Sequence, residues 1–236
     1  MLADINQYSK DNGLPAMDNK SYRDIGAKPA EFSDEAACQF PSGWQGEQSF
    51  DVDSVHTTAP EANILYVGGF NCGGGLDVAM SKILDGKLAN IVSNSYGNVG
   101  EALPQDVIEG TLNIHLQAAG EGIGLYFSSG DNGDQAAKLG YASPDFPASS
   151  PWVTSVGGTS LEVDKNNRYL FETGWGNRLN KVITNPDGSK AYAGPQPGPV
   201  QGGGAGGGVS AVFDQPVYQK GIVPDSLANG HRVSPH

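Results

Sequence analysis

Short apolar runs alternate with helical patterns along residues 60–156. Four such runs, each closed by glycine, serine or asparagine, predict buried strands over residues 63–67, 88–93, 122–129 and 152–156. Between them, apolar positions at helical spacing predict helices over residues 77–84 and 106–119, and each opens with an aspartate that suits a helix start. This alternation at short intervals predicts an α/β fold with a doubly wound, mainly parallel sheet.

The two ends of the chain follow other patterns. Leu2, Ile5 and Tyr8 are spaced as on one helical face, so we expect a helix at the start with no strand before it. After Trp175 the pattern becomes that of loops. Residues 195–208 (PQPGPVQGGGAGGG) are rich in proline and glycine, which predicts an exposed linker or surface loop.

The charge balance excludes some partners. The 236 residues include 14 Lys and Arg against 26 Asp and Glu, a net charge of −12. Such a field repels nucleic acid and anionic membranes, and no apolar stretch approaches the roughly 20 residues of a membrane span. Charged residues make up only 17% of the chain and glycines number 34, a composition typical of a secreted enzyme. We therefore expect neither a nucleic-acid nor a membrane partner.

Cys38 and Cys72 are the two cysteines of the chain. Two thiols are too few for a thiol-rich metal site. They predict either one disulfide in an oxidising compartment, which we favour, or two buried free thiols.

Two acidic patterns are candidates for chemistry. Glu47 and Asp51 lie four apart in a segment whose apolar positions allow a helix, so their carboxylates would share one helical face about 6 Å apart at Cβ. Such a pair can be tuned for acid–base work, although a solvated acidic helix start has the same spacing. Asp131 follows the predicted strand at residues 122–129, at the end where open parallel sheets bind ligands, but Asp-Asn-Gly is also a common turn sequence.

Other patterns carry weaker signals. The glycine run at residues 68–75 lacks the endings that phosphate and dinucleotide loops need, and no histidine has a metal-ligand spacing. Ser160 and Ser210 follow Gly-Thr and Gly-Val but lack the frame of a nucleophile elbow.

Taken in order, several stretches resemble the sedolisin family of serine-carboxyl peptidases, whose fold is subtilisin-like. The matching stretches are GEQSFDVDSVHTTAPEANILYVG, NIVSNSYGNVGE, GLYFSSGDNGD, PDFPASSPWVTSVGGTSL, and ETGWGN followed by GGGVSAVFDQPVYQ. They extend over about 170 residues in the family's order. The resemblance implies that residues 1–236 are part of a peptidase catalytic domain, without its first strand and C-terminal portion.

The resemblance also implies roles for individual residues. Glu47 matches the general base, Asp51 the carboxylate that supports it, and Asp131 the aspartate of the oxyanion hole. Matches to substrate-binding positions are Asn94, Ser95, Tyr96, Gly97 and Glu101 beside the bound peptide, and Asp145 in a substrate pocket. Tyr96 stands where many members have Trp.

Two departures from the family concern the C-terminal side. The nucleophilic serine of the family lies in a Gly-Thr-Ser-Ala-like motif that would follow His236, and Ser160 matches a different, non-catalytic strand. The calcium site of the family is also C-terminal, so we expect no cofactor or metal in this chain.

The resemblance implies a secreted serine-type endopeptidase or tripeptidyl-peptidase that acts on peptides or proteins at acidic pH. A glutamate base stays partly ionised at about pH 3–5, where histidine is protonated, and an oxyanion aspartate donates only when protonated. This chain alone is expected to be inactive, and the C-terminal portion is a candidate partner if it is a separate chain. The alternatives are a non-catalytic peptide-binding domain on the same scaffold and an unrelated α/β small-molecule-binding domain.

Overall fold

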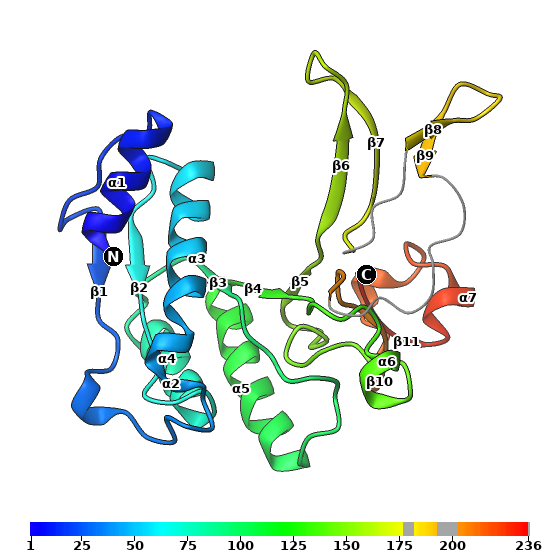
Figure 1. Cartoon of the computed structure of the whole chain (residues 1–236). Coiled ribbons are helices and arrows are strands. Elements are labelled where there is room, and N and C mark those ends of the chain that lie inside the picture. Colours follow the sequence, from blue (N-terminus) through cyan, green and yellow to red (C-terminus); the bar gives the residue numbers. More distant parts are fainter. Residues whose placement is uncertain (177–181, 193–202, 236) are drawn as a thin grey trace. The chain divides into compact units, whose positions relative to one another are not determined.

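The computed structural model describes residues 1–176, 182–192 and 203–235 (Figure 1). The chain divides into two compact units. Unit 1 consists of residues 1–90 and 120–123, and unit 2 consists of residues 91–119 and 124–236. That residues 1–236 form one domain stays a prediction.

Unit 1 is built on a short parallel pair of strands, β1 (Tyr22–Asp24) and β2 (Ile64–Tyr66). Its helices are α1 (Leu2–Asn12), η1 (Pro29–Glu31), α2 (Phe40–Gly43), α3 (Gln45–Thr58) and α4 (Gly74–Asp85). In Figure 1, α1 and α3 lie side by side. Ile5 of α1, Val52 of α3 and Tyr22 of β1 are buried together, so one apolar cluster joins both helices to the strands.

Unit 2 contains a parallel sheet in the order β3 (Ile91–Asn94), β4 (Gly124–Ser128) and β5 (Thr154–Val156). Helix α5 (Gln105–Glu121) connects β3 to β4, and the short α6 (Ala136–Leu139) follows β4. Ile108 of α5 packs with Phe146 and Phe213 in the buried core of this unit. The predicted α/β fold is confirmed: the four predicted strands all lie in parallel pairs with helices between them, and β1, which pairs with β2, was not predicted.

The rest of unit 2 contains antiparallel pairs of strands. These are β6 (Thr159–Val163) with β7 (Tyr169–Gly174), β8 (Val182–Thr184) with β9 (Lys190–Tyr192), and β10 (Gly208–Asp214) with β11 (His231–Ser234). The link between β10 and β11 contains η2 (Val217–Gln219) and α7 (Asp225–Ala228). The prediction of a loop-like chain after Trp175 is therefore wrong for the described residues. Strands of three residues, such as β8 and β9, are too short to produce a clear alternation.

The glycine-rich segment also differs from its prediction. Residues 195–202 of the predicted 195–208 loop lie outside the described residues. Residues 203–208 are buried and not exposed. Glycine backbone without side chains can pack directly against other backbone, so this composition suits a close contact as well as a flexible loop. In the described part of the chain, no helix is long and apolar enough to cross a membrane.

Candidate active site

Two carboxylates lie one helical turn apart on α3. Glu47 is in the first turn and is exposed, and Asp51 is half-buried. Val52 and His56 form the buried face of the same helix, so Asp51 lies at the border between the core and the surface. The helix that the sequence predicts for the Glu47–Asp51 pair is present.

Asp51 lies close enough to Tyr66 of β2 to affect its ionisation. Burial first, and then the charges of Asp24 and Asp51, raise the pKa of Tyr66. Asp24 is the register partner of Tyr66 in the parallel pair, so these two side chains are on the same face of the strands. The Tyr66 phenol therefore stays protonated near these two charges. Sequence analysis missed Asp24 because β1, at three residues, gives no clear alternation, and it missed Tyr66, which lies in the predicted strand at residues 63–67, because no motif marks it.

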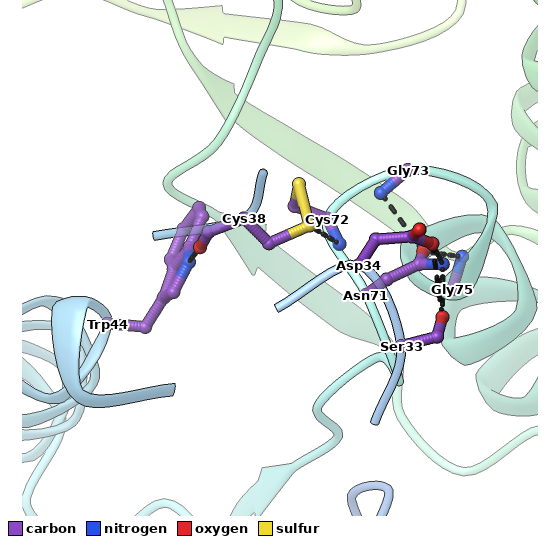
Figure 2. Close-up of a disulfide and its surroundings, with 8 residues drawn as sticks. All are labelled: Ser33, Asp34, Cys38, Trp44, Asn71, Cys72, Gly73 and Gly75. Carbon is purple, nitrogen blue, oxygen red and sulfur yellow. Dashed lines mark hydrogen bonds between the residues drawn. A yellow bond between two sulfur atoms is a disulfide. The ribbon is translucent and has the colours of Figure 1, made fainter. Parts of the chain in front are cut away.

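The start of α3 is anchored by the disulfide between Cys38 and Cys72 (Figure 2). The Trp44 indole N–H donates to the Cys38 carbonyl oxygen at 2.7 Å, and the Cys72 backbone N–H donates to Cys38 Sγ at 2.9 Å. Trp44 immediately precedes α3. The disulfide thus ties the entry of the helix that carries Glu47 to the loop before α4.

That loop is the glycine run at residues 68–75. Asn71 Oδ1 accepts the backbone N–H groups of Gly73 and Gly75 at 3.1 and 2.8 Å, as Figure 2 shows. Its Nδ2 donates to Ser33 Oγ at 3.0 Å and to Asp34 Oδ2 at 3.1 Å. A side chain of the protein therefore uses the N–H groups that a phosphate would need, in agreement with the weak nucleotide signal of the sequence.

In unit 2, Asp131 follows β4 in an exposed turn that rests on the glycine-rich segment. The Gly130 and Asp131 carbonyl oxygens accept the N–H groups of Gly206 and Gly204 at 2.7 and 2.8 Å. A Cβ at Gly206 would lie 2.1 Å from the Ser129 carbonyl oxygen, so only glycine fits there. The buried glycines thus form a backbone platform beneath the Asp131 turn.

Asp145 supports the same turn from within the unit. It is buried, and its Oδ1 accepts the Gly100 N–H at 2.8 Å and Gln135 Nε2 at 2.9 Å. Burial raises the pKa of Asp145, those hydrogen bonds and the charge of Lys138 oppose the rise, and the nearby charge of Asp131 adds to it. Asp145 therefore links the Asp131 turn to the segment around Gly100.

The predicted substrate-edge segment begins at Asn94, the last residue of β3. Asn94 is buried, and its Nδ2 donates to the Tyr126 carbonyl oxygen at 3.0 Å. The Tyr96 ring meets the Phe127 ring edge-on with centroids 5.5 Å apart. Ser95 also has an interaction partner. These contacts hold the segment against β4.

The same segment continues along residues 97–98 against Phe146. The Asn98 N–H donates to the Phe146 carbonyl oxygen at 2.6 Å, and a Cβ at Gly97 would lie 3.1 Å from that oxygen. Glycine at this position therefore lets the two backbones approach closely.

Glu101 is buried and accepts hydrogen bonds inside unit 2. Only 4% of it is exposed, and its carboxylate accepts Ser210 Oγ at 2.7 Å and the Ala211 N–H at 2.9 Å. Ser210 Oγ also accepts the N–H groups of Val212 and Phe213 at 3.0 and 2.9 Å. Ser210 is thus a buried structural hydroxyl, and Glu101 holds β10 to the edge segment.

Within unit 2 the structure therefore brings together the edge segment, Glu101, Asp145 and the Asp131 turn. Glu47 and Asp51 belong to unit 1, so their convergence with Asp131 stays a prediction. Sequence analysis missed Gln135 and Gly206, whose contacts come from distant segments. Among the described residues, no group of three or more His, Cys, Asp or Glu side chains is arranged to hold a metal ion.

Curated relatives of this chain are peptidases. It is 30% identical to kumamolisin of Bacillus sp. (strain MN-32) over 194 residues, which are 80% of this chain and 31% of the relative. It is 27% identical to sedolisin of Pseudomonas sp. (strain 101) over 75% of this chain and 31% of that protein. Identity to rat tripeptidyl-peptidase 1 is 30% over 64% of this chain and 22% of the relative. The chain spans less than a third of the length of these relatives.

A solved structure of a peptidase is also similar to this chain. Pseudomonas sedolisin, a serine-carboxyl proteinase complexed with two molecules of pseudo-iodotyrostatin, matches 99% of this chain and 60% of that chain with a TM-score of 0.73 and 25% identity. No family model matches the sequence. From these similarities and the fold, the chain belongs to the sedolisin family and has a subtilisin-like fold.

Proposed function

We propose that this chain supplies the carboxylic residues of a serine-carboxyl peptidase that cleaves peptides or proteins at acidic pH. The observation that carries the proposal is the Glu47–Asp51 pair, one turn apart on α3, in a member of the sedolisin family. Glu47 is exposed, as a base that meets substrate must be, and Asp51 is half-buried near Tyr66.

Each carboxylic residue has its own role in this proposal. Glu47 takes the proton of an attacking serine hydroxyl, and Asp51 orients Glu47 and balances the charge that develops on it. Asp131, protonated in acid, donates a hydrogen bond to the oxyanion that forms on the substrate carbonyl. Each step needs acid or tolerates it, which supports an acidic working range.

The buried acids act as positioning residues. Asp145 and Glu101 both accept hydrogen bonds from backbone N–H groups, and these bonds hold the Asp131 turn and the edge segment in register. We assign Asn94 and Ser95–Gly97 to the edge beside a bound peptide. Asp145 would reach a substrate side chain only if its bond to Gln135 opens.

No residue of this chain matches the nucleophilic serine of the family, so we expect the chain to be catalytically silent alone. The test is hydrolysis of a peptide substrate by the purified chain between about pH 3 and 7. Turnover that an active-site serine reagent abolishes would contradict the expectation, and variants at Ser160 and Ser210 would then locate the nucleophile.

A non-catalytic peptide-binding domain on the same scaffold is the second candidate. It predicts that the chain binds peptides and that no serine supplied in trans or in a longer chain gives turnover. The disulfide supports a secreted protein in either case, because such bonds persist in oxidising compartments.

A further inference from the structure

The segment that joins α1 to β1 carries a motif that the proposed function does not use (Figure 1). Asn19, Lys20 and Ser21 form an Asn-X-Ser tripeptide in which X is not proline, and the sequence contains no second Asn-X-Ser or Asn-X-Thr. Such a tripeptide is the acceptor sequence for N-linked oligosaccharides in secreted chains. Because it also occurs by chance, it indicates a modification site only where the structure leaves the asparagine accessible.

Two buried side chains hold the ends of this turn. Met17 is 4% exposed, its N–H donates to Asn6 Oδ1 of α1 at 2.8 Å, and its carbonyl oxygen accepts Asn6 Nδ2 at 2.9 Å. Tyr22, the first residue of β1, is also buried and belongs to the same apolar cluster as Met17. Asn19 lies between these two buried residues and is exposed, so the turn presents it to solvent.

Asp18 and Ser21 close the turn without the Asn19 side chain. Asp18 Oδ1 accepts the N–H groups of Lys20 and Ser21 at 2.8 and 2.9 Å, and the Asp18 N–H donates to Ser21 Oγ at 2.9 Å. The Asp18 carbonyl oxygen accepts the Tyr22 N–H at 2.9 Å. Among the described residues, none forms a hydrogen bond with the Asn19 side-chain amide. A sugar on Asn19 Nδ2 would therefore break no hydrogen bond of the fold.

The disulfide between Cys38 and Cys72 supports the same chemistry from a separate observation. Disulfides form and persist in oxidising compartments, which secreted chains enter and where N-linked oligosaccharides are added. We propose that Asn19 is an N-glycosylation site. This inference does not depend on the proposed peptidase function.

The donor in this reaction is an oligosaccharide carried on a polyisoprenyl diphosphate. Asn19 Nδ2 attacks the anomeric carbon of the first sugar, so that a carbon–nitrogen bond forms. The bond from that carbon to the diphosphate oxygen breaks, the lipid diphosphate leaves, and Nδ2 gives up one proton. The Ser21 hydroxyl is the group that the transferase recognises in the acceptor.

The test is mass spectrometry of the 236-residue chain produced in the secretory pathway of yeast cells. We expect an oligosaccharide that a peptide N-glycosidase removes, with conversion of Asn19 to aspartate in the tryptic peptide of residues 11–20. Asn12 precedes Gly13 in the same peptide, and Asn-Gly deamidates spontaneously. Fragment ions must therefore place the conversion at residue 19.

Variants assign the oligosaccharide to this tripeptide. Asn19→Gln should remove it because the amide moves by one methylene group, and Ser21→Ala should remove it because the hydroxyl is lost. Ser21→Thr keeps a hydroxyl and should keep the oligosaccharide. The matched control Asn12→Gln, at an exposed asparagine outside the motif, should leave the occupancy of Asn19 unchanged. An unmodified Asn19 in the wild-type chain, or an oligosaccharide that persists in the Asn19→Gln chain, would overturn the proposal.

Urea unfolding tests whether the folded chain accommodates the oligosaccharide. The glycosylated chain should unfold at a urea concentration no lower than that of the Asn19→Gln chain, because the turn is closed by Asp18 and Ser21. A clearly lower midpoint for the glycosylated chain would show that the fold does not present Asn19 to solvent, and this result would also overturn the proposal.

Discussion

Asp145 lies directly against Gly130, so closely that a Cβ on residue 130 would fall 2.1 Å from Asp145 Oδ2. Gly130 precedes Asp131 and has a φ of 109°, a conformation that side-chain-bearing residues rarely adopt. The position of the proposed oxyanion residue therefore depends on a glycine that leaves room for a buried acid. This arrangement explains why Ser-Gly-Asp is more than an ordinary turn here.

Gly130→Ala should destabilise unit 2 by at least about 2–3 kcal/mol, because it combines the steric overlap with a strained backbone. The matched control is Gly133→Ala in the same turn, where φ is 60° and no atom lies within 4 Å of the added Cβ. Gly133→Ala should lower the free energy of unfolding by about 1 kcal/mol. Urea unfolding measures both values, and equal costs would show that the Asp145 contact is not responsible.

Loss of the disulfide should destabilise the chain by about 3–4 kcal/mol in the chain-entropy model, since the bridge closes a separation of 34 residues. The double variant Cys38→Ser with Cys72→Ser, compared with the oxidised protein by urea unfolding, measures the effect. Intact mass under non-reducing conditions is the control. Two thiols that react with an alkylating agent in denaturant would rule out the bridge.

His115 should lower the free energy of unfolding of the chain in acid. Burial lowers its pKa from 6.5 to about 4, its Nδ1 lies 3.1 Å from Ser150 Oγ, and its ring centroid lies 5.4 Å from that of Phe127. Below pH 6.5 His115 binds a proton in the unfolded chain but not in the folded chain. The folded state therefore becomes less stable as the pH drops from 6.5 towards 4. His115→Gln should reduce the difference in unfolding free energy between pH 7 and pH 4 by about 3 kcal/mol.

Urea unfolding at both pH values tests this prediction, with direct NMR titration of the His115 ring as a second readout. A ring that titrates near its ordinary value of 6.5, or a variant with an unchanged difference between the two pH values, would contradict it.

Strands β2 to β5 could be predicted because their signal is local, whereas β1 (Tyr22–Asp24) was not predicted. Residues 63–67, 122–129 and 152–156 contain β2, β4 and β5 as apolar runs closed by turn residues. The run at 88–93 only overlaps β3 (Ile91–Asn94), because Leu88 belongs to the turn that ends α4. The helix of Glu47 and Asp51 was predictable for the same reason, since spacing of four is visible in the sequence.

The support of the site could not be predicted because it is non-local. Glu101 meets Ser210 across 109 positions, and Asp145 meets Gly100 across 45 positions. No periodicity encodes such pairs. Residues 203–208, which are glycines except for Ala205, were misassigned to an exposed loop because composition does not distinguish flexible backbone from backbone packed against Ser129 and Gly130.

The central claim is that Glu47 and Asp131 act in one acidic peptidase site. A chimera, in which residues 1–236 replace the structurally equivalent segment of Pseudomonas sedolisin, provides the rest of the catalytic domain and tests the claim directly. We expect it to hydrolyse a peptide substrate between about pH 3 and 5. Glu47→Gln and Asp131→Asn should each lower kcat/KM at least about 100-fold, whereas the exposed control Glu61→Gln should leave it unchanged. A folded chimera without activity, or full activity in the Glu47→Gln chimera, would contradict the account.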